Sequence, residues 1–179
     1  DQGEPDDRYG SFVAPYTVAM NHSHFFNFRL DFDVDGPTNS LAVDRIVTEE
    51  LPAANPRRSV WRVQTDTPLR EAEGKRTSTL TAPEHWRVVS PSRIGPQGYP
   101  SGYLLEGHGV RTMLLESDYM RRNAGFTEHA LWTTPMRADE MFASGAYPTN
   151  AAVDQGLPAW TQANRGIENT DIVLWYTIG

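Results

Sequence analysis

"NHSHFFNFRLDFDVDG", residues 21–36, alternates between two kinds of side chain, and this alternation decides the fold class. Successive side chains of a strand point to opposite faces, so the even-numbered and odd-numbered residues form two sets. The even set consists of His22, His24, Phe26, Phe28, Leu30, Phe32 and Val34. The odd set is polar and ends in Asp31, Asp33 and Asp35. We therefore predict a strand over residues 22–34, with both histidines on the side that faces the core.

The rest of the chain is organised in short apolar segments separated by turn residues. "DGPTN" at 35–39 predicts a turn, and "LAVDRIV" at 41–47 reads as the returning strand of a hairpin, which forms a β-ribbon. Further strands are predicted for 59–65, 85–89, 129–135 and, as a buried strand, "DIVLWYTI" at 171–178. Short helical segments are predicted at 117–126, capped by Ser117, and at 137–145. The prediction is an all-β, sandwich-like fold with long loops, a β-ribbon arm and little helix.

Composition narrows the classes of function. The chain has 179 residues, which suits one domain, and 39% hydrophobic residues, which is typical of a globular protein. A net charge of −7 argues against a nucleic-acid partner. There are no cysteines, so disulfides and thiolate metal sites are excluded. No apolar run approaches the roughly 18 residues of a membrane span.

The two histidines form a candidate metal pair. Alternate residues of a strand lie about 6.6 Å apart along it, so two imidazoles on one face can converge on a single ion. Neutral imidazole suits copper, zinc, iron or nickel, and two ligands alone select none of them. The alternatives are two partly buried, hydrogen-bonded histidines, or a cupin-like site. A cupin site wants a glutamate where Phe28, Arg29 and Leu30 stand.

The three aspartates on the odd face need a separate explanation. Three carboxylates on one strand face repel each other unless they are spread into water or neutralised. One interpretation is a solvated edge. The other is a site for a hard cation such as calcium, which binds carboxylate and backbone carbonyl oxygens. The second interpretation calls for another acidic residue from elsewhere in the chain.

A set of collinear motifs gives a more specific indication. "RYGSFVAP…NHSHFFNFRLDFDVDGPTNS" resembles the copper-ligand strand of the copper-containing primary-amine oxidases. The resemblance continues in order through "NPRRSVW", "HALWTTP…DEMFASGAYP", "QGLPAW" and "ENTDIVLWYT". It implies oxidative deamination of a primary amine to an aldehyde, with ammonia and hydrogen peroxide as products and oxygen as the second substrate. It further implies copper(II) and topaquinone as cofactors, in a large β-sandwich that forms a homodimer.

The same resemblance implies two metal sites. His22 and His24 match the two strand histidines that bind copper. Asp31, Asp33 and the carbonyl of Phe32 match a second site, for calcium or manganese, which Asp171 and the carbonyl of Ile172 complete. Asp35 has no role in this comparison. His85, His108 and His129 are expected to be structural or exposed.

Three parts of the family's machinery have no match here. The third copper histidine would follow Gly179, and none of the seven tyrosines sits in the Asn-Tyr-Asp/Glu-Tyr motif that yields topaquinone. The catalytic aspartate lies further upstream still. We therefore expect residues 1–179 to be a single segment of the catalytic domain, truncated at both ends, with no catalytic or cofactor-forming residue and no activity alone. The alternatives are a stand-alone, non-catalytic metal-binding β domain, or one part of an assembly whose other chain carries the cofactor. The amine and the compartment stay open.

Overall fold

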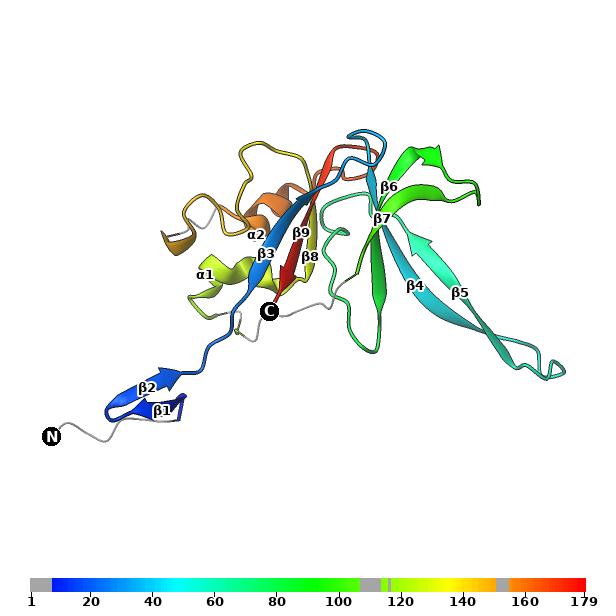
Figure 1. Ribbon diagram of the computed structural model, residues 1–179. Coiled ribbons are helices and arrows are strands. Elements are labelled where there is room, and N and C mark those ends of the chain that lie inside the picture. Colours follow the sequence, from blue (N-terminus) through cyan, green and yellow to red (C-terminus); the bar gives the residue numbers. More distant parts are fainter. Residues whose placement is uncertain (1–7, 107–113, 116, 151–154) are drawn as a thin grey trace.

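The described part of the chain forms two larger antiparallel sheets and a separate hairpin (Figure 1). The structure is a computed structural model, and it describes residues 8–106, 114–115, 117–150 and 155–179. Short helical turns lie beside one of the two sheets (Figure 1). The predicted mainly β fold with little helix is confirmed.

Strand β9 (Ile172–Ile178) is the centre of the three-stranded sheet, between β3 (Phe26–Asp31) and β8 (Leu131–Pro135). Ile172, Leu174 and Tyr176 on one face join a core with the second sheet, whereas Val173 and Trp175 on the other face pack under the helical turns. Burial on both faces explains why this strand reads as a continuous apolar run. The prediction of a buried strand at 171–178 is confirmed.

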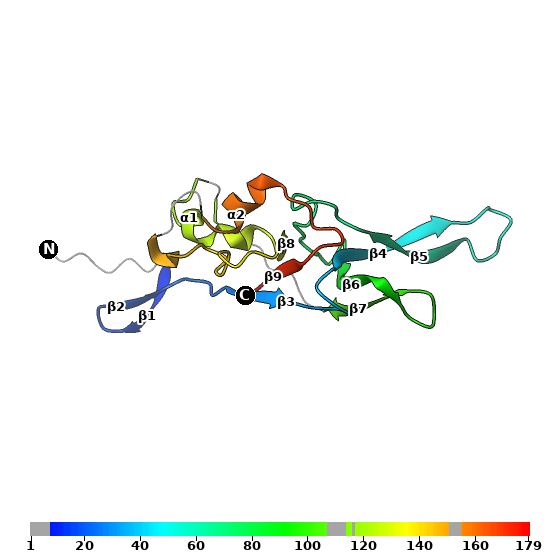
Figure 2. The same cartoon turned by 90° about the horizontal axis from the view of Figure 1, so that it is seen from above.

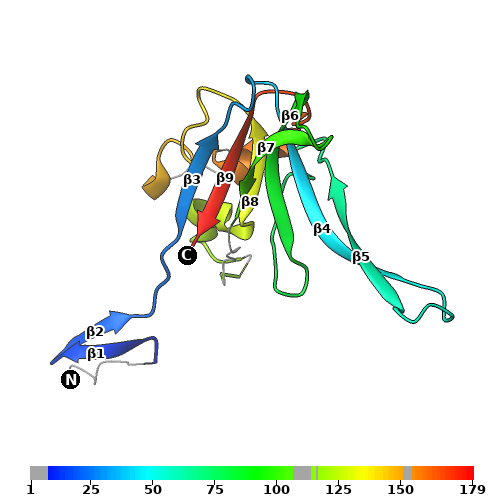
Figure 3. The ribbon, with the colours of Figure 1, turned by 45° about the vertical axis from the view of Figure 1, so that its right-hand side comes forward.

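The second sheet has the order β5-β4-β6-β7. Its strands are β4 (Ser40–Glu50), β5 (Ser59–Asp66), β6 (Glu84–Ile94) and β7 (Pro100–Leu105). The inner half of β4 is buried, and its outer half continues with β5 as an arm that projects from the body (Figure 3). A β-ribbon arm is therefore present, as predicted, but it is formed by β4 and β5. The predicted hairpin across 35–39 is wrong, because β3 pairs with β9 and β4 pairs with β5 and β6.

Strand β3 is shorter and more exposed than predicted. Leu30 and Phe32 pack against the core, but Phe26 and Phe28 are 58% and 47% exposed. The cause is that β3 lies at the edge of its sheet, and the contacts with the core are made near its Asp31 end. Apolar and polar side chains therefore alternate along this strand as predicted, but the core covers only half of the apolar face.

A small hairpin precedes β3. Strands β1 (Gly10–Ala14) and β2 (Thr17–Met20) pair around Pro15 and Tyr16, where Tyr16 takes a positive φ of 60°. Proline followed by a residue with positive φ is the pattern of a type II turn. The hairpin and the β4–β5 arm project at opposite ends of the molecule (Figure 2).

Among the residues that the structure describes, helical structure is limited to single turns. They are α1 (Arg121–Ala124), α2 (Leu157–Trp160), η1 (Gly125–Glu128), η2 (Pro148–Asn150) and η3 (Thr161–Ala163). The predicted Ser117 cap is wrong, because α1 begins at Arg121. In the turn before it, Asp118 Oδ1 accepts a hydrogen bond from the Met120 N–H at 2.9 Å. The prediction of helix at 137–145 is also wrong. In the described part of the chain, no helix has the length and apolarity needed to cross a membrane.

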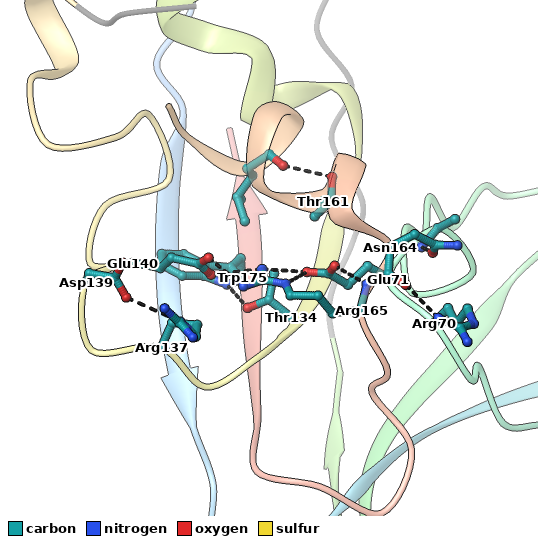
Figure 4. Close-up of polar contacts among 12 residues, drawn as sticks. Arg70, Glu71, Thr134, Arg137, Asp139, Glu140, Thr161, Asn164, Arg165 and Trp175 are labelled. Atoms are coloured by element: carbon teal, nitrogen blue, oxygen red, sulfur yellow. Dashed lines mark hydrogen bonds and ion pairs between the residues drawn. The ribbon is translucent and has the colours of Figure 1, made fainter. Parts of the chain in front are cut away.

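A buried ion network ties three loops together (Figure 4). Arg165 donates to both oxygens of Glu140, at 2.7 and 3.1 Å, and to Glu71 Oε1 through Nε and Nη2, at 3.0 and 2.6 Å. Burial disfavours the charged guanidinium, but the two carboxylates outweigh it and raise the pKa of Arg165 above its ordinary value. Glu71 is fully buried and also accepts the backbone N–H of Arg165 at 2.6 Å.

Replacing Glu71 with glutamine is expected to lower the free energy of unfolding by about 3 kcal/mol, because it breaks a buried ion pair. Chemical denaturation would measure the loss. Glu49→Gln is the matched control, since Glu49 is 61% exposed and its contact with Arg62 is 3.7 Å long. Equal effects of the two substitutions would contradict the structural role of the network.

His129 is half-buried beside β8. Its ring lies 4.8 Å from the Trp132 ring in an edge arrangement, and Thr77 Oγ1 is 3.4 Å from its Nδ1. Lys75 Nζ lies 5.0 Å from the same indole ring. Burial and then the charge of Lys75 lower the pKa of His129, and Glu128 only partly opposes them. His129 thus has a structural position, whereas His108 lies outside the described residues.

A lowered pKa in the folded state means that the unfolded chain binds more protons at this site. The contribution of His129 to stability is therefore present above about pH 6.5 and is lost as the pH falls below that value. We expect His129→Gln to lose less stability than the parent chain between about pH 7.5 and pH 5.5. Denaturation curves at both pH values make the comparison.

Candidate metal-binding sites

The two histidines lie just before strand β3. Residues 21–25 are not in a strand, because the ladder between β3 and β9 ends at the pair Phe26 and Ile178. Without a partner strand, residues before Phe26 have no backbone ladder to hold them extended. His22 and His24 are both exposed, so the prediction that they face the core is wrong.

The histidines nevertheless lie side by side. Their ring centroids are 4.8 Å apart and the rings meet edge to face. His22 Nδ1 lies 2.8 Å from the carbonyl oxygen of Met20, which can only accept, so Nδ1 is the donor and, in the neutral ring, Nε2 keeps its lone pair. In metal sites, a histidine that binds the ion through one ring nitrogen is oriented by a hydrogen bond that the other ring nitrogen donates. Two exposed, adjacent imidazoles therefore fit part of a copper site.

No third ligand stands beside them in the described part of the chain. Among those residues, the one group of three or more acidic or histidine ligands is Asp31, Asp33 and Asp171. It does not include His22 or His24. The histidine pair thus offers two candidate metal ligands, without a third beside them among the described residues.

Asp31, Asp33 and Asp171 come together at the other end of β3. Each offers one carboxylate oxygen, and these oxygens all lie within 4.8 Å of one another. Asp31 is the last residue of β3 and Asp171 directly precedes β9, so pairing of the two strands brings them together. Burial, and then the charges of Asp31 and Asp33, raise the pKa of Asp171, and Arg29 partly offsets them. Asp35 is outside this group and lies 3.8 Å from Arg93.

Backbone geometry directs one carbonyl of β9 toward β3. The N–H of Met136 donates to the carbonyl of Asp171 at 2.8 Å, so that carbonyl points toward β8. Successive carbonyls of a strand point to opposite sides, so the carbonyl of Ile172 points toward β3. This is the side on which Asp31 lies. Carboxylate and carbonyl oxygens are the ligand set that calcium takes in proteins.

Asn39 holds the loop of this site, and sequence reasoning missed it. Its side chain is fully buried, accepts the N–H of Val34 at 3.1 Å and donates to the carbonyl of Val34 at 3.0 Å. Its backbone N–H and carbonyl both pair with Thr170, at 2.8 and 3.0 Å. One residue thus fixes the loop that carries Asp33 next to the segment that carries Asp171. The only signal in the sequence is an asparagine in a turn-rich stretch, where asparagine is common for other reasons.

Comparison with known proteins gives a consistent result. The family model "Copper amine oxidase, enzyme domain" matches residues 1–179. The peroxisomal copper-containing amine oxidase alpha 2 of Arabidopsis thaliana is 41% identical over 177 residues, which is 97% of this chain and 26% of that protein. The primary amine oxidase of Lens culinaris is 33% identical over 176 residues, with 97% and 26% covered. The chain therefore spans about a quarter of the length of these relatives.

Solved structures share the fold. The copper-containing benzylamine oxidase of Hansenula polymorpha superimposes with a TM-score of 0.85 at 23% identity, over 95% of this chain and 27% of that chain. The amine oxidase of Aspergillus nidulans gives a TM-score of 0.76 at 20% identity, over 95% and 24%. The family resemblance inferred from the motifs is confirmed. The chain belongs to the copper amine oxidase family, of which it matches the enzyme domain.

Proposed function

We propose that this chain is the metal-binding segment of a primary-amine oxidase. The complete enzyme would convert a primary amine, oxygen and water into an aldehyde, ammonia and hydrogen peroxide. The observation that carries the proposal is the pair of adjacent imidazoles, with His22 oriented by the Met20 carbonyl. Membership of the copper amine oxidase family and the names of the Arabidopsis and Lens relatives support it.

In this proposal His22 and His24 hold copper(II) through their ring nitrogens. His22 would use Nε2, because its Nδ1 is engaged with the Met20 carbonyl. When bound, copper and topaquinone supply the redox chemistry that passes two electrons from the amine to oxygen. The contribution of this chain is to place and orient two of the copper ligands just before β3.

The remaining parts of the machinery are proposed to lie outside residues 1–179. None of the seven tyrosines of the chain is in the topaquinone motif, and two histidines do not complete a copper site. We propose a single segment, truncated at both ends, that does not oxidise amines alone. The third copper ligand, the topaquinone tyrosine and the base that removes the proton would come from flanking sequence.

The second site is proposed to bind calcium or manganese in a structural role. Its ligands would be Asp31, Asp33 and Asp171, with the carbonyls of Phe32 and Ile172. From His24 to Asp31 the chain covers seven residues, or roughly 20 Å if extended. This separation argues that the second cation takes no part in amine chemistry. It would instead join the end of β3 to the start of β9.

A homodimer is proposed for the complete enzyme. The arm formed by β4 and β5 projects from the body and exposes Ile46, Trp61 and Val63 at 53% or more. Large apolar side chains gathered on a projecting element are typical of a protein interface. The family resemblance favours a second copy of the same chain as the partner.

The test uses the natural polypeptide that contains these residues. We expect amine-dependent production of hydrogen peroxide, and we expect His24→Ala to abolish it together with most of the bound copper, because one imidazole is removed. Copper analysis and a peroxide-coupled assay measure both. The control is His85→Ala, since His85 is exposed and outside the candidate sites.

Three outcomes would contradict the proposal. Full activity of His24→Ala would exclude His24 as a copper ligand. Amine oxidation by residues 1–179 alone would overturn the proposed inactivity of the segment. Stoichiometric copper without any peroxide from the natural polypeptide would favour the alternative, a non-catalytic metal-binding β domain.

The second site has its own test. Saturating calcium or manganese is expected to raise the melting temperature, because a ligand that binds only the folded state stabilises it. Asp33→Asn should remove most of this increase. Asp35→Asn should keep it, because Asp35 is adjacent and exposed but lies outside the cluster. An equal response of the two variants would count against Asp33 as a ligand.

A further inference from the structure

Arg29 is a cation fixed beside the three carboxylates. It lies on β3 directly opposite Trp175 of β9, and its guanidinium carbon is 5.6 Å from the centre of the indole ring. Its Nε donates to the carbonyl of Glu140 at 3.3 Å, and its Nη1 is 3.4 Å from Asp31 Oδ2. The side chain is only 19% exposed. Arg29 therefore contacts the carboxylate cluster through Asp31, from the side that faces the protein interior.

The two groups that position Arg29, the Glu140 carbonyl and the Trp175 ring, belong to residues that are fixed by contacts of their own. Glu140 is tied by its carboxylate to Arg165, which is bound in turn to the buried Glu71 (Figure 4). Trp175 is 1% exposed, and its Nε1 donates to Thr134 Oγ1 at 3.0 Å. A guanidinium stacked on a buried indole and bonded to an anchored carbonyl has little freedom to move. Its charge is therefore present at this place whether or not an ion is bound.

The net charge of the three aspartates together with Arg29 bears on how strongly this site binds a cation. Asp31, Asp33 and Asp171 carry three negative charges when ionised, and Arg29 is the one basic residue within ion-pair distance of any of them among the described residues. The four groups together have a charge of −2, which a divalent cation neutralises. Without Arg29 the charge would be −3, with stronger repulsion in the empty site and stronger attraction for the ion.

We propose that Arg29 is a positioning residue and built-in counter-cation that lowers the divalent-ion affinity of the Asp31–Asp33–Asp171 site. The proposal rests on the second cation site of the proposed function. Arg29 shares Asp31 with the ion, and its charge repels the ion across the carboxylate. In exchange, it stabilises the strand end when no ion is present. The site would thus bind calcium or manganese reversibly rather than as a permanent part of the fold.

The experiment compares Arg29→Gln with Arg29→Lys in the natural polypeptide that contains these residues. Glutamine removes the charge and keeps a donor for the Glu140 carbonyl, whereas lysine keeps the charge and loses the planar fork. After treatment with chelator, calcium binding is measured by titration calorimetry and melting temperature with and without calcium. The matched control is Arg137→Gln, because Arg137 makes the same Arg-x-Asp contact with Asp139 at 3.4 Å but is 58% exposed.

We expect Arg29→Gln to bind calcium about tenfold more tightly than the parent, as removal of one nearby positive charge predicts. Its melting temperature in chelator should fall, and saturating calcium should close most of that gap. Arg29→Lys should stay within about threefold of the parent affinity, because it keeps the charge. Arg137→Gln should behave as the parent.

The outcomes separate this inference from the proposed site. If the parent binds calcium and Arg29→Gln binds it equally or more weakly, the counter-cation role is overturned and the site stands. If neither the parent nor any variant binds calcium or manganese, both the site and the role of Arg29 are overturned. If Arg29→Gln fails to fold, an Arg29→Lys affinity far tighter than that of the parent would also overturn the proposal. A purely structural role for Arg29 would lower melting temperature without tightening calcium binding.

Discussion

The burial of strand β9 on both faces is the constraint on which the rest of the structure depends. Leu174 faces a core shared with the four-stranded sheet, and Trp175 faces a second core under the helical turns. A strand in this position must have covering layers on both sides and hydrogen-bonded neighbours along both edges. Strands β3 and β8 are these neighbours, and the pairing of β3 with β9 brings Asp31 beside Asp171. The acidic cluster is thus a consequence of the ladder that supports the core.

Residues far apart in the sequence hold the loops around this ladder. Arg165 contacts Glu71 across 94 positions and Glu140 across 25. Each of these residues would look ordinary in a surface loop, but together they place one guanidinium between two buried carboxylates. The network also reaches β3, because the carbonyl of Glu140 accepts from Arg29. Loops without regular structure therefore determine where a charge lies near the carboxylates.

Sequence reasoning succeeded where local pattern decides the structure. The apolar run at 171–178 and the alternation along β3 both predicted strands, and the order of motifs led to the family. It failed where the outcome depends on a partner. The period of two cannot say which strand pairs with β3, so the hairpin across 35–39 was wrong, and the exposure of His22 and His24 was missed for the same reason. Asn39 and Arg165 could not be predicted, because the contacts that define their roles are made by the fold.

Strand β3 separates the histidine pair from the carboxylates, and this position restricts how its sequence can vary in length. An insertion or deletion of a single residue within β3 would exchange its two faces, turning Leu30 away from the core or Arg29 away from Trp175. Changes of two residues would preserve the faces but shift the ladder with β9. The segment 21–25 has no strand partner, but a change of one residue between His22 and His24 would separate the two adjacent imidazoles. Among natural variants that keep both metal sites, length differences should therefore be absent between His22 and Asp31.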